Sequence, residues 1–243
     1  MKIEKYKHLG NGKYKVFIDG DSHIIYEDII LKYSILGKSE ISKDDLDIYL
    51  KDNKFYDAYY RSVSYINKKL RSKLEIKKYL SKDFTKTVID KVIKKLSEDG
   101  YLKEDVYASA YINDQINLKM VGPLKIEDDL LKLGISKHII EDQIKVYTKD
   151  IECEKIRKMI KKDINLNKNR SAVMLKNKIL ISLINKGFIK NHIEECLEEF
   201  SFNDEEIYKK EYSKTYKKLS QKYNGKELEY KVKMKMYQKG FKV

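Results

Sequence analysis

The hydrophobic pattern of the first 30 or so residues differs from that of the rest of the chain. Apolar and polar residues alternate over 13–18, a Gly-Asp pair follows at 20–21, and further apolar residues follow at 23–26. Alternation on both sides of such a turn is typical of a β-hairpin. An earlier strand over 3–8, with an Asn-Gly turn at 11–12, predicts a three-stranded sheet. Such a small sheet is not stable alone, so we expect it to pack on the following helices.

From about residue 42 onward the apolar spacing is helical, and a five-residue motif recurs along the chain. We call it the repeat motif. Its four copies occupy 80–84, 131–135, 184–188 and 237–241, so their last residues lie 51, 53 and 53 positions apart. In three copies a glycine precedes the closing apolar residue, as in Lys-Gly-Phe at 186–188. A nearly constant period over three intervals indicates tandem helical repeats.

Apolar positions beyond each repeat motif also keep a constant spacing. The first lies five residues after the motif, the second four residues later, and a bulky third residue three positions after that. Spacings of four and three place these side chains on one helix face, which must be buried. The positions are Ile89, Ile140 and Ile193, then Ile93, Ile144 and Leu197, and finally Leu96, Tyr147 and Phe200.

Each repeat is predicted to contain three helices, which in the first repeat cover 53–69, 72–80 and 85–98. Ser72 and Glu75 fit a capping box at the start of the second helix, in which each satisfies a backbone N–H of the other. The short connections between these helices predict units that stack on their neighbours.

Glycines mark the ends of the predicted helices. Gly100 suits the left-handed position after the third helix, and the glycine of the repeat motif ends the second helix in the same way. In the first repeat Asp83 takes the place of that glycine, so we expect an unusual backbone conformation there. The fourth repeat stops shortly after its motif, where the other repeats place a third helix, as either a shortened cap or a lost tail.

Together these patterns predict a mainly α protein. We expect an elongated, curved solenoid of tandem three-helix repeats with a small N-terminal β-hairpin or three-stranded sheet. The expected boundaries are 1–41 for the β region, 42–102, 103–148 and 149–201 for three repeats, and 202–243 for an incomplete fourth repeat.

The charge balance points to a polyanionic partner. The chain has 52 basic and 38 acidic residues and a net charge of +14. Contacts from lysine and arginine to phosphates supply most of the sequence-independent affinity for nucleic acid. Only four of the basic residues are arginines, and an AT-rich coding sequence would also raise the lysine content.

Other features exclude several classes of protein. No stretch of about 18 apolar residues and no signal-peptide core exists, so we expect a cytoplasmic protein without membrane contact. Cys153 and Cys196 sit among apolar residues at helical spacing, which predicts buried thiols. The four histidines never fall at metal-ligand spacing, so neither zinc nor another cofactor is expected.

Two segments carry a resemblance to a known family. Over 65–80 a basic cluster precedes Arg-Ser and an acidic residue that opens a helix, and over 96–108 a helix closes with Gly before an acidic turn and an aromatic-Ala pair. In order and spacing these segments resemble the signature of the RecX family. The segment 16–20 resembles the N-terminal extension of its longer Gram-positive members. Most arginine positions of the family hold lysine here, which keeps the charge but loses the planar, bidentate contact.

The resemblance implies a non-enzymatic and mainly negative regulator of the RecA recombinase. RecX proteins lie in the groove of the RecA–DNA filament, restrain strand exchange and ATP hydrolysis, and damp the SOS response. Many also bind single- and double-stranded DNA. We therefore expect a monomer whose partners are the RecA filament and DNA.

Basic residues are the candidate contacts to DNA or to the filament. One cluster surrounds the junction of the first two helices of repeat 1, and another follows the first helix of repeat 3. The candidates are Arg61, Lys68, Lys69, Arg71, Lys73, Arg157, Lys158, Lys161, Lys162, Lys168 and Arg170. The alternative for each cluster is an ordinary solvated surface, and for Arg71 a structural bond to carbonyls at a helix end. The tyrosines near these clusters could pack in the core or stack on bases.

No catalytic constellation is predicted. The sequence lacks a glycine-rich phosphate loop, His-Glu-x-x-His and Gly-x-Ser-x-Gly. Its adjacent carboxylates, such as those at 128–129, point about 100° apart on a helix and make poor metal clamps. Two rival functions remain: a helical-repeat protein that binds DNA or RNA without a recombinase partner, and an enzyme that acts on nucleic acid.

Overall fold

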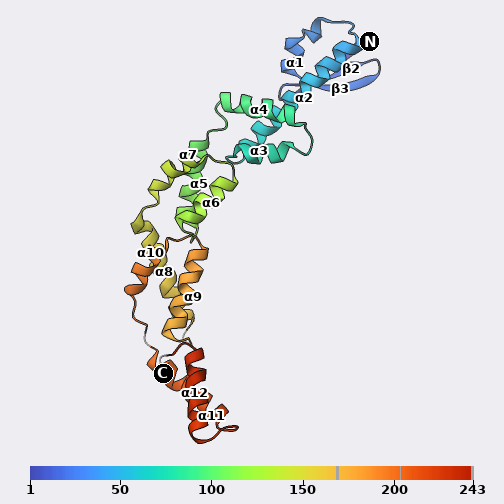
Figure 1. The fold of residues 1–243 in the computed structure, drawn as a ribbon. Helices are drawn as coiled ribbons and strands as arrows, with labels where there is room; N and C mark the ends of the chain where they lie inside the picture. Colours follow the sequence, from blue (N-terminus) through green and yellow to red (C-terminus); the bar gives the residue numbers. More distant parts are fainter. Residues whose placement is uncertain (168–169, 203, 242–243) are drawn as a thin grey trace. The chain divides into compact units, whose positions relative to one another are not determined.

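The computed structural model describes residues 1–167, 170–202 and 204–241. These residues form two compact units, each of which is described by itself (Figure 1). The N-terminal unit comprises Met1–Tyr107 and Leu133–Ser136, and the C-terminal unit comprises Ala108–Lys132 and Lys137–Val243. The described residues are mainly helical, with one three-stranded sheet near the N-terminus, as predicted.

The sheet contains β1 (Ile3–Gly10), β2 (Lys13–Ile18) and β3 (Asp21–Tyr26), in that order and antiparallel. Both connecting turns have two central residues with positive φ, at 11–12 and at 19–20. Such turns match the right-handed twist of the strands. The second turn was predicted one residue too late, because Asp21 already pairs with Ile18 in the sheet.

The predicted β region is not wholly β. It also contains the helix α1 (Glu27–Lys32) and the short η1 (Ile35–Gly37). The sheet packs on helices, as expected of so small a sheet. A single core cluster joins strand residues such as Val16 and Ile25 to Ile29 of α1 and Tyr49 of the next helix.

The first long helix is α2 (Lys43–Ile66), which begins well before the predicted start at residue 53. Ser42 and Asp45 form a capping box at its N-terminus, and the helix continues without a break through the polar residues that follow. Two further helices complete the group, α3 (Lys73–Leu80) and α4 (Lys86–Glu98). Their bounds agree with the prediction to within a residue.

The predicted capping box at the start of α3 is confirmed, since Ser72 accepts from the Glu75 N–H and Glu75 accepts from the Ser72 N–H. The prediction for Asp83 is wrong. Non-glycine residues with positive φ in the described part of the chain are Asn11, Asp19 and Ser34, so Asp83 is not left-handed. Instead α3 closes with a tight turn, in which the N–H groups of Asp83 and Phe84 both donate to the Leu80 carbonyl.

The remaining helices also follow one another in groups. The first group comprises α5 (Glu104–Leu118), α6 (Pro123–Lys132) and α7 (Lys137–Gln143), with the short η2 (Ile144–Val146) after α7. The next comprises α8 (Lys149–Leu166), α9 (Ala172–Asn185) and α10 (Lys190–Glu198), and the last α11 (Glu205–Leu219) and α12 (Gly225–Gln238).

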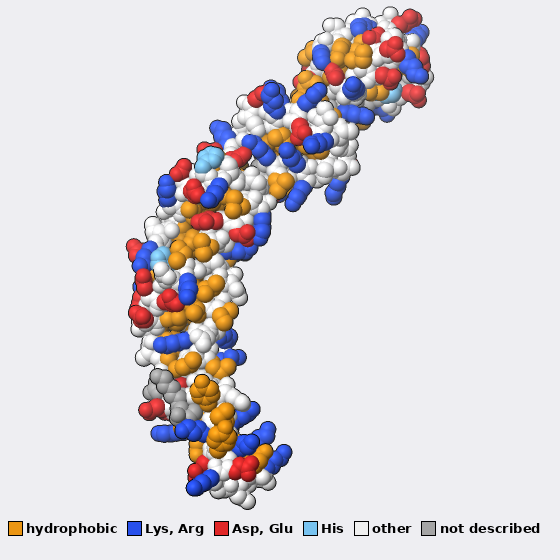
Figure 2. Space-filling model, in the orientation of Figure 1, with side chains coloured by type: hydrophobic (Ala, Val, Ile, Leu, Met, Phe, Trp, Pro, Cys, Tyr) orange, Lys and Arg blue, Asp and Glu red, His pale blue; other side chains and the backbone are white. Residues whose placement is uncertain are grey.

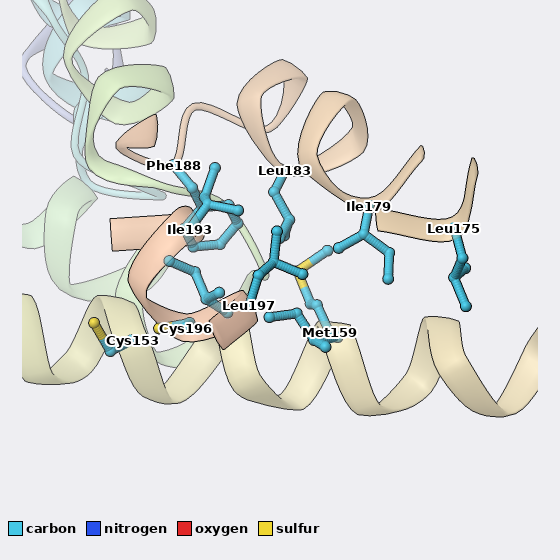
Figure 3. Packing of buried hydrophobic residues seen from close by; sticks show 11 residues of the cluster. Cys153, Met159, Leu175, Ile179, Leu183, Phe188, Ile193, Cys196 and Leu197 are labelled. Atoms are coloured by element: carbon cyan, nitrogen blue, oxygen red, sulfur yellow. The ribbon is translucent and has the colours of Figure 1, made fainter. Parts of the chain in front are cut away.

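The core of the C-terminal unit lies between α8, α9 and α10 (Figure 3). Ile179 and Leu183 of α9 meet Ile193 of α10 there, so the predicted helix face is buried. Cys153 and Cys196 are both buried free thiols in this cluster, as predicted. Burial raises the pKa of Cys196 to about 12, so its thiol stays protonated near neutral pH.

The glycine of the repeat motif has a second role that the sequence did not reveal. Gly134, Gly187 and Gly240 all have positive φ, as predicted. Each also lies against the start of an earlier helix: Gly134 against Leu74, Gly187 against Lys125 and Gly240 against Ser171. At Gly187 a Cβ atom would lie 2.3 Å from the backbone nitrogen of Lys125. The glycine is therefore needed for close approach as well as for its backbone conformation.

Candidate nucleic-acid and protein-binding surfaces

Arg61, on α2, is held by intramolecular partners. Its guanidinium contacts Asp83 at 2.5 Å and Asp57 at 3.7 Å. It also lies over the rings of Phe84 and Tyr79, at 5.2 and 5.8 Å from their centroids. Arg61 thus connects α2 to the end of α3, and its charge is largely balanced by two carboxylates.

Arg71 and Lys73 form the junction between α2 and α3. Arg71 donates to Glu75 at 3.1 Å and covers the Tyr65 ring, with 3.9 Å between the guanidinium carbon and the ring centroid. Lys73 forms an ion pair with Glu104 at 2.8 Å. Arg71 therefore ties the junction together, through a carboxylate and a ring.

Glu75 is the centre of this junction. Burial alone would raise the pKa of its carboxyl group. The Ser72 N–H, the Tyr107 hydroxyl and the Arg71 guanidinium all donate to the carboxylate, and together they hold its pKa below the ordinary value. Glu75 is therefore ionised wherever the protein is folded near neutral pH.

Lys68 and Lys69 differ from these neighbours. Both are exposed at the C-terminal end of α2, and within the described residues neither forms an ion pair. Their charges are consequently available to a ligand.

The candidates of the C-terminal unit divide in the same way. Arg157 makes a bidentate contact to Glu199, with both N–O distances 2.7 Å, and Lys158 pairs with Glu154 at 2.5 Å. The candidates without an ion pair among the described residues are Lys161, Lys162 and Arg170, all exposed. Lys168 lies outside the described residues.

Two buried charged residues were not singled out from the sequence. Lys155 donates to the carbonyls of Gln115 and Lys119, at 3.3 and 2.7 Å, and so caps the end of α5. Glu152 accepts from the Ile189 N–H at 2.7 Å and contacts Nδ1 of His192 at 2.7 Å, at the start of α10. Both residues are structural, and only their unusual place on the apolar face of α8 could have signalled it.

The last two helices contain a dense set of lysines that the sequence reasoning also missed. Lys214 of α11 and Lys239, directly after α12, both pair with Glu211. The other lysines of these helices form no ion pair in the described structure: Lys209, Lys210, Lys217, Lys218, Lys226, Lys231, Lys233 and Lys235. Their density along two short helices is the sequence signal that could have identified them.

The second helix of several repeats exposes apolar side chains at equivalent positions. The first residues of three repeat motifs, Leu131, Ile184 and Tyr237, are 49, 41 and 71% exposed. Further exposed apolar residues lie three or seven positions before these three, which places them on the same helix faces. They are Leu124, Ile181, Tyr230 and Met234. Hydrophobic side chains gather over the C-terminal unit on the face in Figure 2. We call these seven residues the apolar stripe, and exposed patches of this kind mark binding surfaces.

Neither a metal site nor a membrane segment is found in the part of the chain that is described. No group of three His, Cys, Asp or Glu side chains there is arranged to hold a metal ion. No helix of that part combines the length and the apolar composition that a membrane span needs.

Comparison with known proteins gives a consistent result, although no protein-family model matches the chain. The chain is 28% identical over 252 residues to "Regulatory protein RecX" of Bacillus cytotoxicus, covering all of this chain and 93% of that protein. It is 29% identical, with the same coverage, to the protein of that name from Bacillus thuringiensis subsp. konkukian. The chain is thus similar over its full length to regulatory proteins named RecX.

Solved structures show the same fold. A crystal structure of regulatory protein RecX matches with a TM-score of 0.70 over 79% of this chain and 97% of that one, at 23% identity. RecX from Lactobacillus salivarius matches with a TM-score of 0.55 over 60% of this chain and 95% of that one, at 29% identity. The predicted resemblance to RecX proteins and the mainly α fold are thus confirmed.

Proposed function

We propose that this chain is a mainly negative regulator of RecA. It binds in the groove of the RecA–DNA filament and restrains strand exchange, ATP hydrolysis and SOS signalling. The observation that carries the proposal is full-length similarity to proteins named as regulatory RecX proteins. The RecA partner follows from the family resemblance.

The surfaces described above support two kinds of contact. The apolar stripe suits a protein surface, because its side chains repeat at equivalent positions of successive repeats and remain exposed in the free protein. The unpaired lysines suit the phosphate backbone of DNA. The mechanism is occupancy of the filament, which requires no catalytic group and no cofactor. We expect the protein to act as a cytoplasmic monomer.

The test is RecA-dependent strand exchange and ATP hydrolysis with the purified protein added at substoichiometric levels. We expect inhibition of both reactions, with a stronger effect on filaments that are still extending. RecA filaments that keep their full activity in the presence of the protein would contradict the proposal.

A second candidate is a nucleic-acid-binding repeat protein that has no recombinase partner. The net charge of +14 and the unpaired lysines favour it. A salt-dependent affinity for naked DNA or RNA, combined with no effect on RecA, would support this candidate.

A further inference from the structure

A groove in the N-terminal unit lies beside the sheet. The turn after β1, the end of β3 and the helices α2 and α3 all line it. Lys13 comes from the sheet, and Arg61, Ser64 and Tyr65 come from α2. Lys68 follows the end of α2, and Tyr79 comes from α3. The sheet and the first long helices are therefore both needed to form this groove.

The polar side chains that line the groove are rich in hydrogen-bond donors. Two lysines, an arginine, the Asn11 amide and several hydroxyls line it, and no carboxylate does so. The hydroxyls of Tyr26 and Tyr60 already donate to Asp57 and Asp28. Two grooves of the C-terminal unit differ in this respect, since Asp204 and Glu205 line both of them. The groove beside the sheet is consequently suited to an anion.

The aromatic rings of the groove form a fixed wall. Tyr26 stacks on Tyr60 with centroids 5.1 Å apart, and Tyr65 stacks on Tyr79 at 4.4 Å. Arg71 covers Tyr65 as well. Because these ring faces are already occupied, stacking on a base adds little, and recognition depends on charge and hydrogen bonds.

Two cations in the groove are available to a ligand. Arg61 is balanced by Asp57 and Asp83. Lys13 lies over the Tyr26 ring at 5.0 Å and Lys68 is exposed, and neither forms an ion pair among the described residues. Lys13 and Lys68 are thus the charges that a ligand would neutralise.

We propose that this groove binds the phosphodiester backbone of a nucleic-acid strand, with Lys13 and Lys68 contacting phosphates. A DNA backbone offers negative charge and only acceptors, which match the lysine and arginine donors of the groove. An acidic peptide also brings backbone N–H donors, which lysine and arginine cannot accept and which only the hydroxyl oxygens and the Asn11 amide oxygen of the groove could. The proposal rests on the proposed function in one respect, namely that the regulator contacts nucleic acid as well as RecA.

The test measures binding of a fluorescent oligothymidylate to the full-length chain, without RecA, over a range of salt concentrations. The variant is the double substitution Lys13→Gln and Lys68→Gln. The matched control is Lys7→Gln with Lys78→Gln, which removes the same charge from two exposed lysines outside the groove. Circular dichroism melts of both variants check that each remains folded.

We expect the groove variant to bind about tenfold more weakly, and the slope of log affinity against log salt to fall by about 1.4, from two lost phosphate contacts. The control should change affinity by less than about twofold. Equal losses in both variants would overturn the proposal. So would polyglutamate binding that depends on Lys13 and Lys68 while oligonucleotide binding does not, because that would assign the groove to an acidic peptide.

The same variants separate this proposal from the proposed function. Suppose that the wild-type chain leaves RecA unaffected but the groove variant loses oligonucleotide binding. The proposed nucleic-acid groove would then be supported, and the proposed regulation of RecA would be contradicted. Suppose instead that the wild-type chain inhibits RecA but the groove variant and the control variant bind DNA equally well. The proposed regulation of RecA would then be supported, and the proposed groove would be contradicted.

Discussion

Most candidate arginines of this chain are already engaged in holding helices together. Arg61, Arg71 and Arg157 each contact a carboxylate, and the charges that remain free belong to lysines such as Lys68 and Lys161. This division has a physical basis. Arginine offers a planar fork that suits fixed bidentate pairs, whereas lysine is a mobile point charge that suits contact with a phosphate backbone.

The junction around Glu75 should make stability depend on pH. The pKa of Glu75 is lowered in the folded protein, so the unfolded chain takes up the proton first as the pH falls. The stability that Glu75 contributes is therefore present at neutral pH and lost as the pH falls below the ordinary pKa of a glutamate, about 4.3. Urea unfolding of Glu75→Gln should show lower stability at pH 7 and a weaker loss on acidification than the wild type.

Glu98→Gln is a suitable control for this measurement, because Glu98 is exposed at the end of α4 and pairs with Lys94 only at 3.9 Å. The Glu98→Gln variant should have the same free energy of unfolding as the wild type, both at pH 7 and at acidic pH. A Glu75→Gln variant with the same pH dependence as the wild type would exclude the junction as a source of acid sensitivity.

The buried Lys155 gives a second prediction at this scale. Lys155→Met removes the donor to the two carbonyls at the end of α5 and should lower the free energy of unfolding by about 1–3 kcal/mol. Lys158→Met, on the exposed side of the same helix, should change it by less than about 0.5 kcal/mol. Chemical denaturation measures both, and similar losses would mean that the two carbonyls do not need this lysine.

The repeat motif shows how far the elements could be predicted from the sequence. The apolar spacing after each motif identified the buried faces of α4 and α10, because a helix must bury one side. The start of α2 was missed, since its first turns are rich in charged residues and carry little periodicity. The left-handed Asp83 was wrongly expected, because similarity to other motifs cannot reveal that the helix closes with a different turn.

The candidate site was less predictable than the fold. Charge clustering located Lys68 but could not show that Arg61 pairs with Asp83, 22 residues later in the chain. Lys13 was missed for a related reason. It lies 55 positions before Lys68 in the chain, and only the packing of the sheet against α2 brings both residues to one groove.

Close approach at Gly187 should make this glycine more sensitive than one that needs only a positive φ. Gly187→Ala should lower the free energy of unfolding of the C-terminal unit by more than about 2 kcal/mol. The cost of a positive φ at alanine and the cost of the clash between its Cβ atom and the Lys125 backbone add together. Gly225→Ala also has a positive φ but meets open space, so its loss should be about 1 kcal/mol. Equal losses in thermal unfolding would show that the helix start at Lys125 can move aside.

At the scale of the whole molecule, the apolar stripe and the groove beside the sheet belong to different compact units. The contribution of the apolar stripe and that of the groove should therefore be separable by mutation. Each unit retains its own core, so a surface change in one need not disturb the fold of the other.

Changes in the apolar stripe should weaken RecA inhibition and spare DNA binding. We expect the combination Ile181→Glu and Tyr237→Glu to reduce inhibition of RecA ATP hydrolysis by about tenfold or more, as loss of buried apolar anchors does in other interfaces. Affinity for an oligonucleotide should fall only modestly, through the added negative charge. Ile48→Glu, an exposed apolar position on α2, is the control and should leave inhibition unchanged. Full inhibition by the stripe variant would remove this surface from the proposed mechanism.

The contact made by the third repeat motif also links the dynamics of neighbouring repeats. The N–H groups of Gly122 and Leu124, at the start of α6, donate to the carbonyls of Lys186 and Gly187. Hydrogen exchange at these two amides therefore requires that the later motif move away. The protection factors of these two amides should therefore report the opening of the third repeat rather than the opening of α6. Local unfolding then spreads backward along the chain, from one repeat to the one before it.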